Sequence, residues 1–459
     1  MFLIKLYNIL ILSLFFISCE KESYGSSDNN TPVFEEEEIV LDVNGNVIQT
    51  SIDINHFAPS QDCQSCHQQH YNEWSNSMHA HSFNDPIFFN LWIHERENRP
   101  NTGENYCVQC HSPSAFVSNQ DLSNVLSLND INQISDPIKE GVSCQFCHNM
   151  INTSNDVYTQ DHVAAVADYH LSVDKQVMFG PIQNPQQNDY HESVYSEIYN
   201  NSSICLPCHS QFIRGEPIEA TFYEWNNFDG FAMSDATNCQ SCHMKVQPDG
   251  HHDHSFAGVD FHDLTSPIDE SDLGYIKIME LLESAVELEF LNQNDTLINE
   301  IISNQVLNIP LKVKSFTGHK LPSGTSFSRE AWVELLITDA NDNLIFSSGL
   351  INDNVETLDY SDENLLLFTT WLLDENGDTI REASNAHDYI DKTLGTMSTR
   401  FHNYQVPVNE LISPISVSAR MLFRPFKPYI LNESNPDLML NVPIYEMYQI
   451  SKEINITDQ

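Results

Sequence analysis

The feature that most constrains this chain is a Cys-x-x-Cys-His motif that occurs five times in 459 residues and uses ten of the eleven cysteines. Two thiols at this spacing reach the two vinyl groups of one porphyrin, and the next imidazole is then held against the iron, so each motif predicts one covalently attached c-type haem. The predicted attachment thiols are Cys63, Cys66, Cys107, Cys110, Cys144, Cys147, Cys205, Cys208, Cys239 and Cys242, and the predicted proximal ligands are His67, His111, His148, His209 and His243.

Zinc knuckles or disulfides are the alternative interpretation of paired cysteines. With 20 histidines in the chain, chance placement of one after each of five pairs has a probability on the order of one in ten million. Five haems are therefore favoured.

The spacing of the motifs predicts the architecture of residues 58–265. The motifs start 44, 37, 61 and 34 residues apart, and segments of about 40 residues are too short to bury an ordinary side-chain core. The haems must then form the core, wrapped by short helices and loops with little regular sheet. Five large rings in so little protein lie close together, which predicts a path for electrons from haem to haem.

Beyond the last motif the pattern changes. Ser271–Ser284 has apolar residues at helical spacing, which predicts a connecting helix within 266–285. From 286 to 459 cysteine is absent and strand patterns predominate, which predicts an antiparallel β-sandwich and an α+β fold overall. The expected strands are Val286–Leu291, Pro310–Phe316, Ala331–Thr338, Leu344–Ser348, Leu365–Leu373 and Ile415–Phe423.

The N-terminus predicts export. Lys5 precedes the apolar run Leu6–Ile17, which is too short to span a bilayer and is typical of the core of a signal peptide, residues 1–18. The run ends at Ser18-Cys19 and resembles a bacterial lipoprotein cleavage box, which implies lipidation of Cys19. An ordinary signal peptide is the alternative, because Phe16 replaces the usual Leu of that box.

Residues 19–57 are expected to form a tether with a small hairpin. The stretch Glu20–Glu38 is polar and acidic, and Ile39–Gln49 alternates around Asn44-Gly45. The protein is thus predicted to be anchored to a membrane by lipid, in the periplasm or on the outer cell surface. Export also agrees with the haems, because c-type attachment takes place outside the cytoplasm.

The formal net charge is -45, from 65 acidic and 20 basic residues. Such a surface repels nucleic acid, and any partner that it attracts should be basic. A solvated acidic exterior that serves solubility alone is the alternative.

A resemblance to a known family adds candidate distal ligands. Trp74, followed after the first motif by Ser77-Met78-His79-Ala80, resembles the multihaem cytochrome superfamily related to the tetrahaem electron carrier of nitrification and to hydroxylamine oxidoreductase. The resemblance implies that His79 caps a haem iron. Met78 and His81 are adjacent competitors.

Four further stretches extend the resemblance. Glu140–Cys144 and the segment from Phe179 to Ser193 are similar to those that flank the third and fourth motifs in such proteins, which implies His191 as a distal ligand. The step His254-Ser255-Phe256 implies His254, although a histidine-rich loop that binds adventitious metal is the alternative. Gly318–Gly324 resembles the Gly-His-x-x-Pro-Thr-Gly turn that opens a β-domain, with Ser323 in place of Thr, and implies His319; an ordinary turn residue is the alternative.

A fifth distal ligand is unassigned among His70, His94, His162 and His170, or absent. Two histidines on an iron leave no position for substrate, which favours a low-potential electron relay, whereas one open haem would make the protein an oxidoreductase for a small nitrogen or sulfur species. No motif carries Lys in place of His and no tyrosine cross-link motif is recognisable, so the relay is favoured and enzyme activity stays open. A structural subunit of a filament or surface complex is the third hypothesis.

Overall fold

A computed structural model describes residues 34–42, 45–98, 103–153, 167–228, 238–291, 300–303, 306–353, 356–407, 412–432 and 436–458. The predicted signal peptide, Cys19, most of the tether, Asn44 and His162 lie outside the described residues. No described helix has the length and apolar character needed to cross a membrane.

The hairpin predicted over Ile39–Gln49 is present as strands β1 (Ile39–Leu41) and β2 (Val47–Thr50), which pair antiparallel. Gly45 lies between them with φ of 82°, a conformation that glycine adopts without steric cost.

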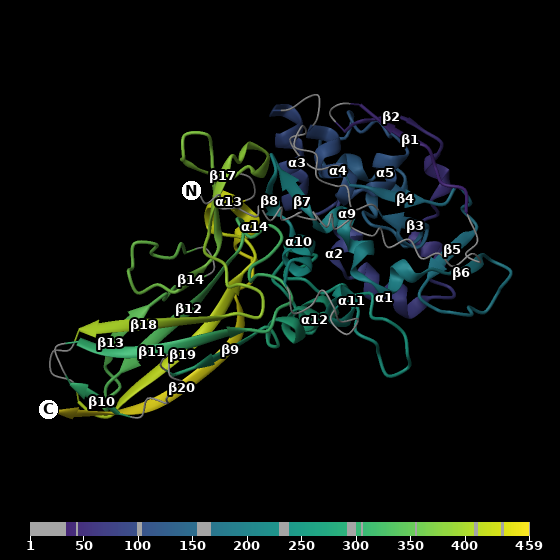
Figure 1. The fold of residues 1–459 in the computed structure, drawn as a ribbon. Helices are drawn as coiled ribbons and strands as arrows, with labels where there is room; N and C mark the ends of the chain where they lie inside the picture. The colour runs from purple at the N-terminus through teal and green to yellow at the C-terminus, as the bar shows by residue number, and fades with distance from the viewer. Residues whose placement is uncertain are drawn as a thin grey trace, which may run out of the picture. The chain divides into compact units, whose positions relative to one another are not determined.

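The region that carries the motifs, residues 58–265, consists of short elements (Figure 1). The helices are η2 (Ser60–Cys63), α1 (Gln68–Ser75), α2 (Met78–His81), α3 (Pro86–Asn98), α4 (Gly103–His111), α5 (Pro113–Val117), α6 (Leu128–Ile131), α7 (Asp136–Lys139), α8 (Cys144–His148), η3 (Glu197–Asn200), η4 (Ser202–Cys205), α9 (Leu206–His209), α10 (Thr221–Asn226) and α11 (Cys239–His243), with η1 (Ile54–His56) just before them. Three two-stranded sheets join them, β3–β4 (Met150–Thr153, Tyr169–Leu171), β5–β6 (Val177–Gly180, Glu192–Tyr195) and β7–β8 (Gln211–Ile213, Glu216–Glu219).

The connecting helix is α12 (Leu273–Leu282), within the predicted range. Asp272 precedes it, and its side chain accepts a hydrogen bond from the backbone N–H of Gly274, which satisfies one of the free donors of the first turn. Ile278 and Leu282, four residues apart, are buried on one face.

The C-terminal strands form three sheets. The largest joins β10 (Glu300–Ser303), β20 (Tyr445–Asp458), β19 (Ile415–Arg424), β12 (Glu330–Thr338) and β13 (Leu344–Ser348), with β14 (Leu367–Phe368) also paired to β12. A second joins β18 (Thr399–Pro407), β11 (Val306–Ser315) and β9 (Val286–Glu289), and a third joins β16 (Thr379–Ile380), β15 (Thr370–Leu373) and β17 (Asp388–Asp391). Figure 1 shows the long strands β11, β12, β18, β19 and β20 side by side. Helices α13 (Pro428–Asn432) and α14 (Pro436–Met439) lie between β19 and β20 in the sequence. Together with the helical region, these sheets confirm the α+β class.

Alternation of side chains explains the core of these sheets. Along β11 every second residue from Leu307 to Val313 is 0% exposed, and these residues share one apolar core with buried residues of β12, β19 and β20. A period of two places such residues on one face of a strand.

Three details differ from the sequence-based expectations. Leu365–Leu373 is not one strand, because β14 pairs with β12 whereas β15 pairs with β16 and β17. Between them Thr369 is fully buried and donates a hydrogen bond to the carbonyl oxygen of Arg329, so the chain changes sheet at this residue. The strands β18 and β20 were not predicted, and β10 pairs with β20 in parallel.

The motif region and the β region pack on each other, and residues 35–459 form one compact unit. Ile87, Phe261 and Leu264 belong to the same apolar core as β11 and β12. Arg214, which follows β7, donates hydrogen bonds to the carbonyl oxygens of Ser384 and Ala386 at 2.7 and 2.9 Å.

Candidate haem sites

The five motifs lie at the ends of short helices. Ser143 caps α8 by accepting a hydrogen bond from the N–H of Phe146, and Asn238 caps α11 in the same way from Ser241. One helical turn places Cys144, Cys147 and His148 on neighbouring positions of one side of α8. This is the local geometry that two thioether bonds and one axial imidazole require.

Contacts between thiols give the order of the motifs in space. Cys63 of the first motif lies beside Cys144 of the third, and Cys205 of the fourth lies beside Cys239 of the fifth. Cys147 lies close enough to Cys205 for their charges to interact. Among the described contacts, the motifs thus follow the order one, three, four, five.

The second motif joins this series at the fourth. Cys110 lies beside Cys208, and Gln211, two residues after the fourth motif, donates to the Sγ of Cys110 at 3.6 Å. Since each sulfur marks the edge of a ring attached to it, the haem of the second motif would be a branch beside that of the fourth.

Four of the motif histidines face a second histidine at a nearly constant distance between ring centres. The pairs and distances are His67 and His191 at 6.3 Å, His209 and His79 at 6.1 Å, His148 and His254 at 6.3 Å, and His243 and His319 at 6.3 Å. With metal–imidazole bonds of about 2.0 Å, and about 1.1 Å from each nitrogen to the centre of its ring, two imidazoles on opposite sides of one iron have centres roughly 6 Å apart. The residues present therefore fit a haem iron at four motifs.

Hydrogen bonds fix the orientation of these rings. The Nδ1–H of His148 donates to the carbonyl oxygen of Phe179 at 2.7 Å, and that of His243 donates to Ala257 at 2.7 Å. His254 and His319 donate likewise to backbone carbonyls nearby, at 2.6 and 2.8 Å. A histidine that ligates a metal through Nε2 commonly donates its other N–H in this manner.

Burial favours the neutral form of four of these rings, which is the form that ligates a metal. It lowers the pKa of His79 and of His254 to about 3, and that of His209 and of His243 to about 4. Nearby imidazoles contribute to each of these shifts.

His111 of the second motif differs. Burial lowers its pKa to about 4, and its Nδ1–H donates to the carbonyl oxygen of Ser82 at 2.8 Å. Its ring stacks on Phe88, with centres 3.8 Å apart and planes 7° apart. Among the residues that the structure describes, no histidine ring stands opposite His111 at the spacing of the other four pairs.

The other candidates for the fifth distal position lie elsewhere, except for His162, which is not described. The ring centre of His70 lies 5.9 Å from that of His67 and 4.8 Å from that of His254, and both of these rings already face another histidine. His94 is 3.7 Å from Glu382. His170 lies at the surface beside Glu36 and Asp168. The competitor His81 donates through Nε2 to the carbonyl oxygen of Ser75 at 3.0 Å, which occupies that nitrogen.

Contacts around His79 explain why two of the recognised stretches occur together. The indole N–H of Trp74 donates to the carbonyl oxygen of Val142 at 2.9 Å, and the N–H of Val142 donates to the carbonyl oxygen of His79 at 2.9 Å. Gly141 has φ of +68°, and a Cβ there would lie 2.5 Å from the carbonyl oxygen of His79. Glycine lets this segment lie directly on the turn that holds His79.

A buried carboxylate holds the loop that carries His254. Glu73 of α1 accepts a hydrogen bond from the backbone N–H of His254 and another from the Nε2–H of His251, each at 2.9 Å. The other ring nitrogen of His251 contacts Asp249 at 2.5 Å. Helix α1 begins directly after the first motif, so Glu73 ties that motif to the segment facing the third.

The turn that carries His319 is held by α10. Glu224 accepts hydrogen bonds from the N–H of Lys320 at 3.1 Å and from the hydroxyl of Ser323 at 2.6 Å. Desolvation raises the pKa of Glu224, and the bond from Ser323 opposes this. This contact is made by a hydroxyl group, which serine and threonine both carry, so Ser323 can replace the Thr of the family turn. Arg329 joins this turn to Asp260 through an ion pair of 2.7 Å.

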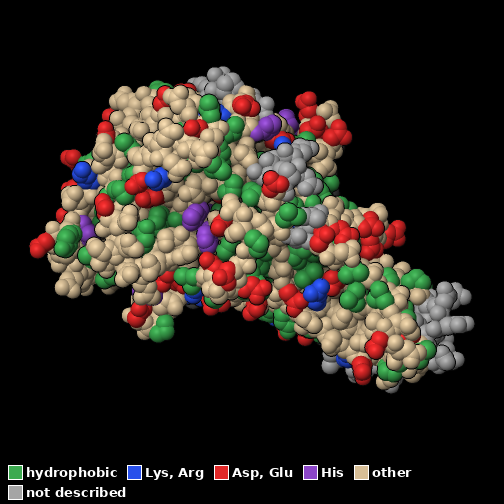
Figure 2. Space-filling view, turned by 180° about the vertical axis from the view of Figure 1, so that it is seen from behind, with side chains coloured by type: hydrophobic (Ala, Val, Ile, Leu, Met, Phe, Trp, Pro, Cys, Tyr) green, Lys and Arg blue, Asp and Glu red, His purple; other side chains and the backbone are tan. Residues whose placement is uncertain are grey.

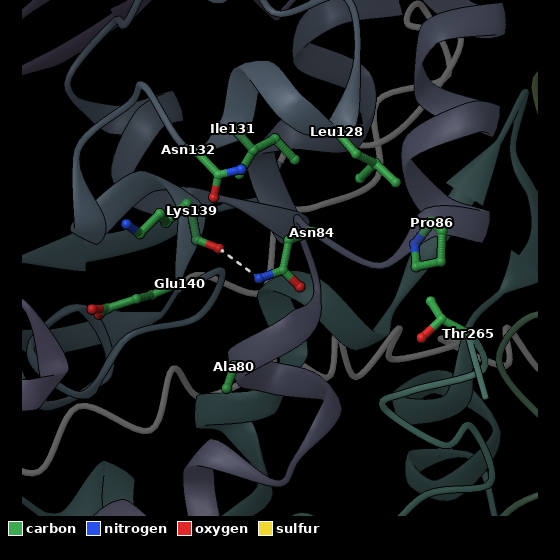
Figure 3. A pocket seen from close by; sticks show the side chains of 9 residues that line it. All are labelled: Ala80, Asn84, Pro86, Leu128, Ile131, Asn132, Lys139, Glu140 and Thr265. Atoms are coloured by element: carbon green, nitrogen blue, oxygen red, sulfur yellow. Dashed lines mark hydrogen bonds between the residues drawn. The ribbon is translucent and has the colours of Figure 1, made fainter. Parts of the chain in front are cut away.

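A hollow of about 360 Å³ lies beside α2 (Figure 3). Figure 3 shows Asn84 donating to the carbonyl oxygen of Lys139, with Leu128 and Ile131 of α6 above them. The lining contains no cysteine and no histidine, so this hollow is separate from the attachment motifs.

Residues 62–149 match the model of a family described as cytochrome c554 and c-prime. The chain is also similar to a solved structure, a penta-heme cytochrome c552 from Thermochromatium tepidum, with a TM-score of 0.64 and 19% sequence identity over 88% of this chain and 100% of that chain. No curated protein matches.

The family match and the shared fold together support a multihaem c-type cytochrome. The family match and the shared fold, with the five motifs, support covalently bound c-type haem and electron transfer. This cytochrome also contains functional contacts that the sequence analysis missed, above all the carboxylates of Glu73 and Glu224. Neither stands in a motif, and in a chain with 65 acidic residues no pattern distinguishes them.

Proposed function

We propose that this cytochrome is an exported pentahaem electron relay in which four haems have two histidine ligands. The ligand pairs are those at 6.1–6.3 Å, with the Cys-x-x-Cys-His residues as attachment sites. That near-constant spacing carries the proposal, because rings that merely packed together would vary in distance. Two imidazoles close each of these irons to substrate and leave electron transfer as the chemistry of these sites.

The protein's own residues serve this function by fixing the ligands. Backbone carbonyls orient His148, His243, His254 and His319, and burial keeps the rings neutral. When bound, the haem supplies the one-electron chemistry. A rigid, neutral ligand set limits the rearrangement that accompanies a change of iron charge.

The remaining sequence-based expectations belong to this proposal. They are export by the segment 1–18, lipidation of Cys19, an acidic tether and hairpin in 19–57, a haem domain over 58–265, a connecting helix in 266–285 and a β-sandwich over 286–459. Two sheets that share one core support the sandwich. The contact of His319 with His243 supports the relation to the hydroxylamine oxidoreductase superfamily and its β-domain turn.

A second candidate function is supported by one observation, the absence of a described imidazole opposite His111. An iron held by His111 alone would have an open position for a small nitrogen or sulfur species, and the protein would then be an oxidoreductase.

Two measurements on the mature protein test the proposal and separate these functions. A pyridine haemochrome assay should give five haems per chain, and four or fewer would mean an idle motif. Electron paramagnetic resonance of the fully oxidised protein should show at least four low-spin irons. A fifth low-spin iron would exclude the open site, whereas two or more high-spin irons would contradict the relay.

A further inference from the structure

The ten attachment thiols differ in their exposure. Cys66 and Cys242 are exposed, whereas the other eight are half-buried. These two cysteines belong to the first and fifth motifs, which are the ends of the series of thiol contacts. Haems attached at these two motifs would have an edge near the surface, where a partner could exchange electrons.

Large apolar side chains accompany the first of these ends. His191, opposite His67, is reached through the segment 181–191, in which Ile182 is 68% exposed and Tyr190 is 78% exposed. Exposed apolar side chains beside a redox group at the surface are typical of a contact surface for another protein.

The charge around this end is mostly negative. Asp62, Asp189 and Glu192 are exposed, and exposed Lys175 precedes Gln176, whose carbonyl oxygen accepts a hydrogen bond from the N–H of Glu192. The sequence contains no Lys or Arg from residue 58 to 95 or from 176 to 213, the segments that hold the first motif and its opposite histidine. We call the surface formed by Cys66, Ile182, Tyr190, Asp62, Asp189 and Glu192 the first-motif surface.

At the fifth-motif end, exposed Val246 follows exposed Lys245. Figure 2 shows one face of the molecule, on which acidic side chains greatly outnumber basic ones. With a formal net charge of -45, a second copy of the chain is repelled.

We propose that the first-motif surface is the docking surface for a basic electron-transfer protein. The proposal rests on the relay function and adds to it where one partner binds and with which charge. Uncharged contact through Tyr190 and Ile182 would bring the partner against the haem edge, while the carboxylates accelerate the encounter.

The test uses the haem-loaded full chain and a basic monohaem cytochrome c as the probe. The reduced protein is mixed with the oxidised probe, and the second-order rate constant is followed against ionic strength. The variant carries Asp62→Asn, Asp189→Asn and Glu192→Gln. A matched control removes three exposed carboxylates of the β region, Glu363→Gln, Glu375→Gln and Asp378→Asn. Unchanged Soret absorption and electron paramagnetic resonance spectra verify that the haems are intact in both variants.

We expect the rate constant of the first-motif variant to fall by about fivefold or more at low ionic strength and its salt dependence to flatten, while the control changes by less than about twofold. Equal effects in both variants, or none, would refute the docking surface and leave the relay intact. If a small inorganic reductant reduces the haems but no form of the protein reduces the probe, the relay itself fails. Self-association of the wild type that the first-motif variant loses would overturn the choice of partner in favour of a second copy.

Discussion

The two regions of the molecule bury their defining residues to different extents. In the β region, Leu307, Ile309, Leu311 and Val313 are 0% exposed, so the core is filled by side chains alone. The motif region also has a side-chain core, in which Phe83, Trp92, Val117 and Leu171 are 0% exposed, so the expectation that haems alone form its core is wrong. Eight of its ten attachment thiols are half-buried and two are exposed. The comparison teaches that the β region has only a side-chain core, whereas in the motif region the attachment thiols lie beside such a core and bound haem would add to it.

The largest effect is expected when the protein is made without its haems, because only the motif region should then lose its structure. When the full chain is made without haem-attachment machinery, residues 58–265 should lose their fold while the β region keeps its sheets. Limited proteolysis should then cut the motif region at least about tenfold faster than residues 306–458, because cleavage requires local opening. Circular dichroism should retain the strand signal. Equal cleavage rates in both regions, or a stable motif region without haem, would contradict the comparison.

A second experiment tests the residue that joins the regions. His319→Ala should convert one low-spin haem to high-spin and leave the haem content unchanged, since the attachment thiols are untouched. Electron paramagnetic resonance and the pyridine haemochrome assay measure the two quantities. His387→Ala, at an exposed position of the β region, is the control and should change neither. An unaltered resonance spectrum in the first variant would remove His319 from the ligands.

A third change acts within the motif region. Gly141→Ala forces a left-handed backbone on a residue with a Cβ and places that atom against the carbonyl oxygen of His79. We expect the free energy of unfolding to fall by about 2–3 kcal/mol and the low-spin signal of the haem held by His79 and His209 to shift. Chemical denaturation followed at the Soret band measures the free energy of unfolding, and electron paramagnetic resonance measures the low-spin signal. The control is Gly258→Ala, where an added Cβ meets no atom within 4 Å; equal losses in both would refute the argument.

A smaller effect concerns a charge inside the β region. Lys427 is fully buried and donates to the carbonyl oxygens of Phe327 and Thr370 at 2.8 and 2.9 Å. Burial lowers its pKa to about 7, against about 10.4 in an unfolded chain.

Between these two pKa values the unfolded chain binds a proton that the folded chain lacks, so Lys427 makes the free energy of unfolding rise with pH, by at most about 1.4 kcal/mol per pH unit. Urea denaturation at pH 7 to 9 should show this rise in the wild type and in Lys392→Met, an exposed control, and a smaller rise in Lys427→Met. The same slope in all three would mean that Lys427 stays protonated.

Local patterns predicted much of this fold, and long-range contacts account for the rest. Leu344–Ser348 is a strand with the predicted bounds, because its pattern is local. The strand expected over Leu365–Leu373 is divided at Thr369 by a hydrogen bond to a distant carbonyl, which no local pattern contains. The alternation of β20 was present in the sequence and was overlooked.

For the candidate sites too, local patterns could be predicted from the sequence and long-range contacts could not. The motifs are local and predict attachment, whereas the histidine that four of them face comes from another segment, as His319 does for His243. Gly141 was named only as part of a family stretch, and its role needs the carbonyl oxygen of His79 to be in place.

Among the described contacts, Cys110 of the second motif lies beside Cys208 of the fourth, which has a consequence for the proposed relay. A haem attached at Cys107 and Cys110 would lie beside the series that joins the first and fifth motifs and not within it. In such an arrangement the side haem could hold one electron while others pass between the ends, so that the relay could supply two electrons to an acceptor that needs a pair.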